Sequence, residues 1–195
     1  MAHFVGTVSV TWLSHDGADR DMQLNSDFTF VDDAGLAWTA EKGAKINGAS
    51  IPRIFWSSFG DPFIGDYRRA SVVHDYYCDV RTRSSDATHR MFYEACLAGG
   101  VSQRRAKTMY TAVKTFGPSW RTISGPLTIN GVEVFARGEE VTFFRAISDA
   151  DYARLEKWVQ ETDPSIEAID AEIERLSREM PVLPPIDDRP ANAVM

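Results

Sequence analysis

Residues 65–80 read GDYRRASVVHDYYCDV and carry the clearest helical signal in the chain. Ala70, Val73 and Tyr77 recur at spacings of three and four residues, which is typical of one apolar face of a helix. Two further helices are predicted at 85–98 and 102–116. Gly99-Gly100 and Gly117-Pro118 supply the stop signals that end them. The centre of the chain is therefore predicted to be a segment of three consecutive helices.

Strand patterns precede this helical segment. Residues 4–13 and 22–30 are rich in β-branched and aromatic side chains, and residues 36–39 form a shorter run of the same type. Turn-forming residues separate the runs, so residues 1–45 are predicted to form a small antiparallel meander. Strands followed by helices favour an α+β fold in which this meander packs on the three helices.

Residues 121–195 are predicted to form a strand–helix extension. Residues 127–135 contain Asn130-Gly131, a strong hairpin signal, and residues 141–144 indicate a further strand. Helices are expected from 148 to about 160 and from 163 to 180, the second with one narrow apolar stripe suited to a helix pair. Pro181, Pro184, Pro185 and Pro190 are expected to end regular structure, and the last ten residues are expected to be disordered.

The net charge of −7 is unevenly distributed along the 195 residues. Residues 1–120 carry 13 basic and 13 acidic side chains, whereas residues 121–195 carry 8 basic and 15 acidic ones. This break supports a division into a core, 1–120, and an acidic extension, 121–195. Within the core, residues 65–120 have a net charge of +4, and we expect the acidic extension to complement these basic helix faces in part.

Composition also limits the class of protein. Nucleic-acid binding is disfavoured, because it needs a net basic surface. No signal peptide and no apolar stretch long enough to span a membrane are present, and two cysteines are too few for a disulfide scaffold. A cytoplasmic location, or delivery by a route without a signal peptide, is therefore expected.

The densest group of chemically active side chains lies between positions 74 and 96. Helical spacing places His74 and Cys78 on one face, and a short turn at 81–84 makes the two helices antiparallel neighbours. His74 and His89 are therefore expected to face each other across the seam between these helices. The candidate residues of this group are His74, Asp75, Cys78, Asp79, Asp86, His89 and Cys96.

The pattern of this group leaves several interpretations open. One is a divalent metal ion such as zinc, held by His74, His89 and a carboxylate from Asp75 or Asp86. A second is metal-free acid–base catalysis by the His74–Asp75 pair. A third is a thiol site that includes Cys78 and Cys96. The fourth is purely structural, with a buried hydrogen-bonded histidine and inert cysteines.

Residues 46–64 form a second candidate region, a loop rich in glycine, proline and aromatic residues. Asn47, Ser50 and the backbone N–H groups near Gly48 are suited to donate hydrogen bonds to a substrate oxygen or anion. The alternative is a tight structural turn fixed by Pro52.

Two motifs together resemble the DUF1353 family of uncharacterised phage, prophage and bacterial proteins. They are the loop Asn47-Gly48-Ala49-Ser50-Ile51-Pro52-Arg53 and the helical run Ala70-Ser71-Val72-Val73-His74-Asp75-Tyr76. The resemblance covers about residues 20–118. It implies that the loop and the His-Asp pair form one site and that residues 121–195 are an addition to a family core.

The resulting functional hypothesis is a hydrolase of phage or prophage type, acting with or without a metal ion on a substrate such as a cell-wall peptide or amide bond. His74 and Asp75 are the candidate catalytic residues. Asn47, Gly48, Ser50 and Arg53 are the candidate substrate-binding residues. The competing hypothesis is a non-catalytic phage structural or accessory protein whose helix 163–180 binds a protein partner or self-associates.

Overall fold

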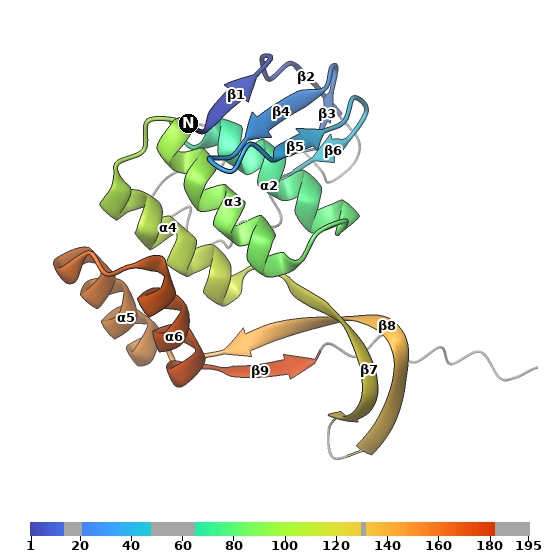
Figure 1. Cartoon of the computed structure of the whole chain (residues 1–195), viewed down its shortest axis with the longest axis vertical. Helices are drawn as coiled ribbons and strands as arrows, with labels where there is room; N and C mark the ends of the chain where they lie inside the picture. Colours follow the sequence, from blue (N-terminus) through green and yellow to red (C-terminus); the bar gives the residue numbers. More distant parts are fainter. Residues whose placement is uncertain (14–20, 48–64, 130–131, 182–195) are drawn as a thin grey trace, which may run out of the picture.

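The computed structural model describes residues 1–13, 21–47, 65–129 and 132–181. Its N-terminal part consists of six short strands arranged as two antiparallel sheets, with the orders β1-β4-β5 and β2-β3-β6 (Figure 1). These strands are β1 (His3–Val5), β2 (Val10–Trp12), β3 (Met22–Leu24), β4 (Phe28–Val31), β5 (Ala37–Ala40) and β6 (Lys45–Ile46).

Each of the two long runs predicted as one strand is divided between the two sheets. The run 4–13 is interrupted after β1 at Gly6, whose φ of +86° is a backbone conformation that side chains disfavour. The run 22–30 is interrupted between β3 and β4. The prediction of antiparallel strands before the helices is confirmed, whereas the assignment of these runs as continuous strands was wrong.

The sheet β1-β4-β5 supplies one wall of the core. Phe28 and Phe30 of β4 alternate with outward-facing residues, and Phe30 lies opposite Trp38 of β5. Tyr77 of the first helix packs edge-on against Trp38, and its hydroxyl accepts a hydrogen bond from the backbone N–H of Thr39. These contacts pack the helix that carries His74 and Asp75 directly against the N-terminal strands.

The three central helices lie beneath these sheets (Figure 1). They are α2 (Arg68–Val80), α3 (Ser85–Ala98) and α4 (Gln103–Phe116), which confirms the three predicted segments to within a few residues. Because α3 packs on both α2 and α4, its buried face lies at the centre of the molecule.

A third antiparallel sheet follows α4, with the order β7-β8-β9. Its strands are β7 (Ser119–Ile129), β8 (Val132–Ala146) and β9 (Arg178–Pro181). The predicted hairpin is present, with the Asn130-Gly131 turn itself outside the described residues. The run 141–144 is not a separate strand, because it continues β8 through the pairing with β7.

Two helices, α5 (Asp149–Thr162) and α6 (Ile166–Leu176), pack beside α4 (Figure 1). Helix α6 is shorter than the predicted helix 163–180. It begins after Ser165, whose hydroxyl accepts a hydrogen bond from the backbone N–H of Ala168. It ends before Ser177, because residues 178–181 pair with β8 instead of continuing the helix.

The apolar stripe of α6 is buried within the chain itself. Ile166, Ile169 and Ile173 belong to the same hydrophobic core as the central helices and the N-terminal sheets. A protein partner of this helix must therefore contact its outer, charged face rather than the stripe. The partner itself stays a prediction.

Ion pairs confirm that the acidic extension complements the basic helices. Lys107 of α4 contacts the Asp163 carboxylate at 2.8 Å, and Arg90 of α3 contacts Glu167 at 2.9 Å. The Lys107 side chain is almost completely buried, so this pair is shielded from solvent on the lysine side. Among the described residues, no helix combines the length and the apolar character that a bilayer crossing demands.

Candidate functional site

The centre of the candidate site is a pair of buried histidines between α2 and α3. Arg81 ends α2 in a left-handed conformation, and the Ser84 side chain caps α3, so the chain reverses within a few residues. His74 Nε2 and His89 Nδ1 are 3.0 Å apart across the resulting seam. The prediction that the two rings face each other is confirmed.

The two rings meet end to end. Their centroids are 5.2 Å apart, and the facing nitrogens are 3.0 Å apart. The difference is about two radii of a five-membered ring, so both nitrogens lie close to the line that joins the ring centres. This is the geometry of a near-linear N–H···N hydrogen bond.

A backbone carbonyl fixes the direction of this hydrogen bond. The Pro118 carbonyl oxygen lies 3.1 Å from His89 Nε2, and a carbonyl only accepts, so His89 Nε2 carries the proton. In neutral His89 the Nδ1 atom is then the acceptor, and His74 donates to it from Nε2. The network therefore assigns the basic nitrogen of neutral His74 to Nδ1.

Both rings are removed from water, with His74 and His89 0% and 1% exposed. Burial, with a smaller effect of the neighbouring His89, lowers the pKa of His74 well below its ordinary value. Burial, with the positive charges of Lys114 and Arg145, lowers the pKa of His89 to about 3 against the opposing hydrogen bond to Pro118. Both histidines are therefore neutral at physiological pH.

Cys78 lies beside the His74 ring. Its Sγ atom is 3.8 Å from Nδ1 and 3.7 Å from Nε2. Because these two distances are nearly equal, the sulfur is not aligned with the lone pair of either nitrogen. This is packing contact rather than the arrangement of a nucleophile with its base. Cys96 is also fully buried, and burial raises the pKa of its thiol.

Asp75 connects α2 to Asn47, the first residue of the loop motif 47–53. The carboxylate oxygen Oδ2 accepts a hydrogen bond from the backbone N–H of Asn47, with an N···O distance of 2.8 Å. Asp75 is largely buried, whereas Asn47 is exposed. The structure thus brings the start of the loop to the His-Asp pair. The other predicted substrate-binding residues, Gly48, Ser50 and Arg53, lie outside the described residues.

Asp86, the fourth residue of the predicted metal site, is positioned differently from the histidines. Its side chain is 72% exposed and contacts the buried Lys114 ammonium at 2.5 Å. Within the described ranges, no three His, Cys, Asp or Glu side chains are grouped closely enough to hold a metal ion. Because the histidine nitrogens also point at each other, the residues as arranged do not form a ligand set. Metal binding stays a prediction that requires the pair to separate.

Sequence reasoning missed several residues that position this site. Phe92 lies one turn from His89 on α3, and its ring centroid is 4.8 Å from that of His74. Gly117 and Pro118 were recognised only as a helix stop, yet Pro118 holds His89 and Gly117 lies against its ring. The three-residue spacing between His89 and Phe92 could have indicated that Phe92 lies near the histidine pair. The role of the Pro118 backbone carbonyl could not be predicted, because every residue has such a carbonyl.

We expect Gly117→Ala to lower the free energy of unfolding by about 1–3 kcal/mol, the usual cost of overpacking. The added Cβ would lie 2.3 Å from the Val113 carbonyl oxygen and 3.2 Å from His89 Cε1. Urea denaturation measures the loss, and the ¹⁵N resonances of the His89 ring report whether the bond to Pro118 is disturbed. An unchanged midpoint together with unchanged ring resonances would contradict this role of Gly117.

Comparison with known sequences matches part of the chain to a protein family. Residues 22–113 match the family described as "Protein of unknown function (DUF1353)", which confirms the resemblance seen in the two motifs. The matched residues contain the start of the loop and the whole histidine pair, whereas Gly117 and Pro118 lie just beyond the match.

Two relatives from Sinorhizobium fredii (strain NBRC 101917 / NGR234) share this part of the chain. "Uncharacterized protein y4jT" is 50% identical over 98 residues, which are 50% of this chain and 29% of that protein. "Uncharacterized protein y4iH" is 38% identical over 117 residues, which are 60% of this chain and 48% of that protein. The chain thus covers less than half the length of either relative. No solved structure matches the chain.

Proposed function

We propose that the DUF1353 segment is a hydrolytic unit in which His74 is the general base and the loop beginning at Asn47 binds the substrate. The observation that carries this proposal is the hydrogen-bond chain from His74 through His89 to the Pro118 carbonyl. Such a chain fixes the tautomer and orientation of a base, as the orienting residue of a catalytic triad does.

The proposed reaction is hydrolysis of an amide bond. Because the His74 ring is fully buried, this scheme requires that the substrate and a water molecule gain access to it. His74 Nδ1 then accepts a proton from the water molecule while the water oxygen attacks the carbonyl carbon of the substrate. The carbon–nitrogen bond then breaks, and the proton passes from His74 to the leaving amine. The lowered pKa of His74 means that its ring is unprotonated at physiological pH before the reaction.

We propose a cell-wall peptide or amide as the substrate, in keeping with the phage and prophage setting that the family resemblance implies. Asp75 has a positioning role in this scheme, because its carboxylate holds the backbone of Asn47 next to the histidine helix. The hydrogen bond would fix the start of the loop next to His74, so that the loop binds the substrate in a defined position.

The test is the release of amines from purified peptidoglycan and from synthetic cell-wall peptides by the full chain. His74→Gln should reduce the rate by about a hundredfold or more, the usual contribution of a general base. His3→Gln is the matched control, because His3 is exposed at the N-terminus and should leave the rate unchanged. Hydrolysis that survives His74→Gln would overturn the assignment.

Metal analysis belongs to the same experiment. If the wild-type chain binds stoichiometric zinc and both His74→Gln and His89→Gln lose it, the histidines act as metal ligands. The proposed role of the hydrogen-bond chain is then wrong. If the amount of bound zinc is unchanged by both substitutions, the histidines are not its ligands, and the metal-free role of the hydrogen-bond chain is supported.

A second candidate function is a non-catalytic accessory protein of a phage, and two observations favour it. The Asp75–Asn47 hydrogen bond and the fully buried His74 are also what a lock between loop and helix requires. If none of the peptide substrates is cleaved, and His74→Gln lowers only the stability of the chain, this structural role is the better account. Light scattering of the full chain would then show whether it self-associates.

A further inference from the structure

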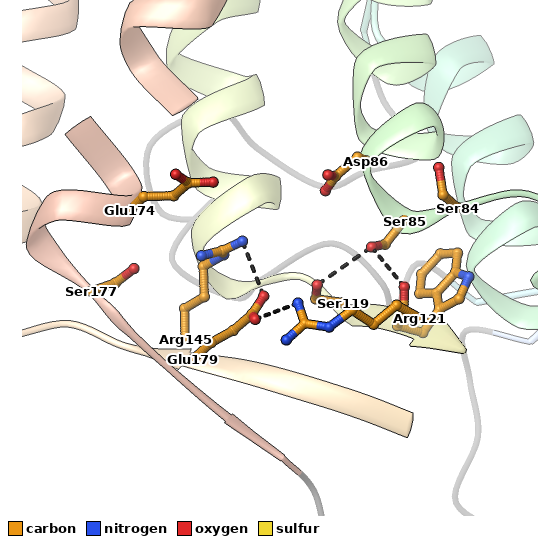
Figure 2. A pocket seen from close by; sticks show the side chains of 10 residues that line it. Ser84, Ser85, Asp86, Ser119, Arg121, Arg145, Glu174, Ser177 and Glu179 are labelled. Atoms are coloured by element: carbon orange, nitrogen blue, oxygen red, sulfur yellow. Dashed lines mark hydrogen bonds and ion pairs between the residues drawn. The ribbon is translucent and has the colours of Figure 1, made fainter. Parts of the chain in front are cut away.

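A polar pocket of about 350 Å³ lies where α3 meets the third sheet and the end of α6. Figure 2 shows its lining, which includes Ser85, Ser119, Arg121, Arg145, Glu174 and Glu179. The pocket is separate from the proposed catalytic site, because neither His74 nor Asp75 nor Asn47 lines it. Its volume lies within the range of small-molecule sites.

The basic side of the pocket is built from two arginines that share one carboxylate. Arg145 Nη2 lies 3.2 Å from Glu179 Oε1, and Arg121 Nη1 lies 2.5 Å from Glu179 Oε2. These three side chains together keep one positive charge. The Arg145 side chain is nine-tenths buried, and its Nε atom has no hydrogen-bond partner among the described residues. This part of the pocket is therefore suited to bind a second carboxylate.

The acidic side of the pocket is Glu174, on the last turn of α6. No ion pair to Glu174 occurs within the part of the chain that the structure describes, whereas the nearby Asp86 is neutralised by Lys114. Figure 2 shows the Glu174 carboxylate and the Arg145 guanidinium directed into the same space, which Asp86 and Ser119 border on the other side. One unneutralised negative charge thus faces one excess positive charge.

Hydroxyl groups line the wall between the two charged sides. Ser85 Oγ lies 3.2 Å from the Trp120 carbonyl oxygen and 3.4 Å from Ser119 Oγ. Both serines are buried, and a hydroxyl can both donate and accept, so they can bind either the amide or the carboxylate of a ligand.

We propose that this pocket binds a small zwitterion, namely an α-amino acid or a dipeptide, with its carboxylate on Arg145 and Arg121 and its ammonium on Glu174. A simple anion such as phosphate fits less well, because three acidic side chains line the same space. A divalent cation is disfavoured by the two guanidinium groups. The inference is independent of the proposed hydrolase activity.

The binding test uses isothermal titration calorimetry with the full chain and alanylalanine as the probe. We expect a dissociation constant below about 1 mM. The N-acetylated dipeptide lacks the ammonium and the dipeptide amide lacks the carboxylate, so each should bind at least tenfold more weakly. A parallel titration with free alanine distinguishes an amino acid from a dipeptide as the ligand. Tighter binding of alanylalanine assigns the pocket to a dipeptide, and tighter binding of alanine assigns it to an amino acid.

Variants connect the binding to the pocket. Glu174→Gln should weaken the dipeptide at least tenfold but leave the N-acetylated form unaffected, since that form has no ammonium to lose. Glu172→Gln is the matched control on the same helix, because Glu172 pairs with Arg175 and does not line the pocket. Because Glu174 is exposed, its substitution should not disturb folding, which a thermal melt checks.

The proposal is overturned by any of three results. The first is the failure of both alanine and alanylalanine to bind at millimolar concentration. The second is equal binding of the parent and blocked dipeptides, and the third is equal effects of Glu174→Gln and Glu172→Gln. Arg145→Gln adds a second readout on the basic side, where loss of binding should be confined to ligands that keep their carboxylate.

Discussion

Acidification from about pH 7.5 to about pH 5.5 should remove some 2–3 kcal/mol from the free energy of unfolding. The cause is the pair of buried neutral histidines, His74 and His89. In the unfolded chain each histidine takes up a proton below a pKa of about 6.5, whereas in the folded chain burial prevents this. The unfolded state therefore binds more protons below this pH, and stability falls as the pH decreases.

The pH window follows from the two lowered pKa values. Stability should be at its plateau above about pH 7 and should decline by about 1.4 kcal/mol per pH unit for each histidine. For His89 the decline should continue to its folded-state pKa of about 3. Urea denaturation at a series of pH values measures this slope directly.

The control for this prediction is His3→Gln, which should keep the full slope because His3 is exposed. His89→Gln should lower stability at neutral pH but flatten the profile, since one of the two proton-linked groups is gone. A wild-type profile that is flat between about pH 5 and about pH 7 would show that the histidines are protonated in the folded protein, and the assigned hydrogen-bond direction would then be wrong.

The second large effect is expected from Ile173→Ala, at about 2–5 kcal/mol. Ile173 is fully buried on α6 and belongs to the core that includes Tyr110 and Val113 of α4. Truncation removes apolar contact area and leaves a cavity that the surrounding helices can fill only in part. Because one core spans the central helices and the extension, the unfolding transition should stay single while its midpoint decreases.

Leu97→Ala on α3 is the matched control, because Leu97 is 37% exposed and should cost well under 1 kcal/mol. Circular dichroism and tryptophan fluorescence recorded in urea should give coincident curves for the wild type and for both variants. Two separate transitions in Ile173→Ala, one for each part of the chain, would show that α6 folds independently of the central helices.

The helices were predictable from the sequence to the extent that local signals define them. The stripe of Ala70, Val73 and Tyr77 and the stops at Gly99 and Gly117 identified α2, α3 and α4. The prediction that the helix 163–180 continues to residue 180 was wrong for a non-local reason. Residues 178–180 have acceptable helical propensity, but pairing with β8 satisfies their backbone hydrogen bonds in another way.

The candidate site shows the same division between local and non-local information. Spacing alone placed His74 opposite His89, because both lie on the facing sides of adjacent antiparallel helices. Spacing could not reveal Pro118 as the acceptor or Lys114 as the partner of Asp86, since both contacts join segments distant in sequence. The pocket at the start of α3 was missed for that reason too, because residues of α3, β7, β8, α6 and β9 contribute to it.

The shared core described for α4 and α6 also bears on how this segment occurs in other proteins. The family match ends at residue 113, yet one side of α4 is covered by α5 and α6, which lie beyond that point. The boundary of sequence similarity therefore does not coincide with the boundary of the folding unit. Any protein that joins the DUF1353 segment to different neighbouring sequence must cover this side of α4 in another way, including Tyr110, whose hydroxyl donates a hydrogen bond to Asp170 of α6. Grafting or excising residues 22–113 alone would expose that apolar surface to water.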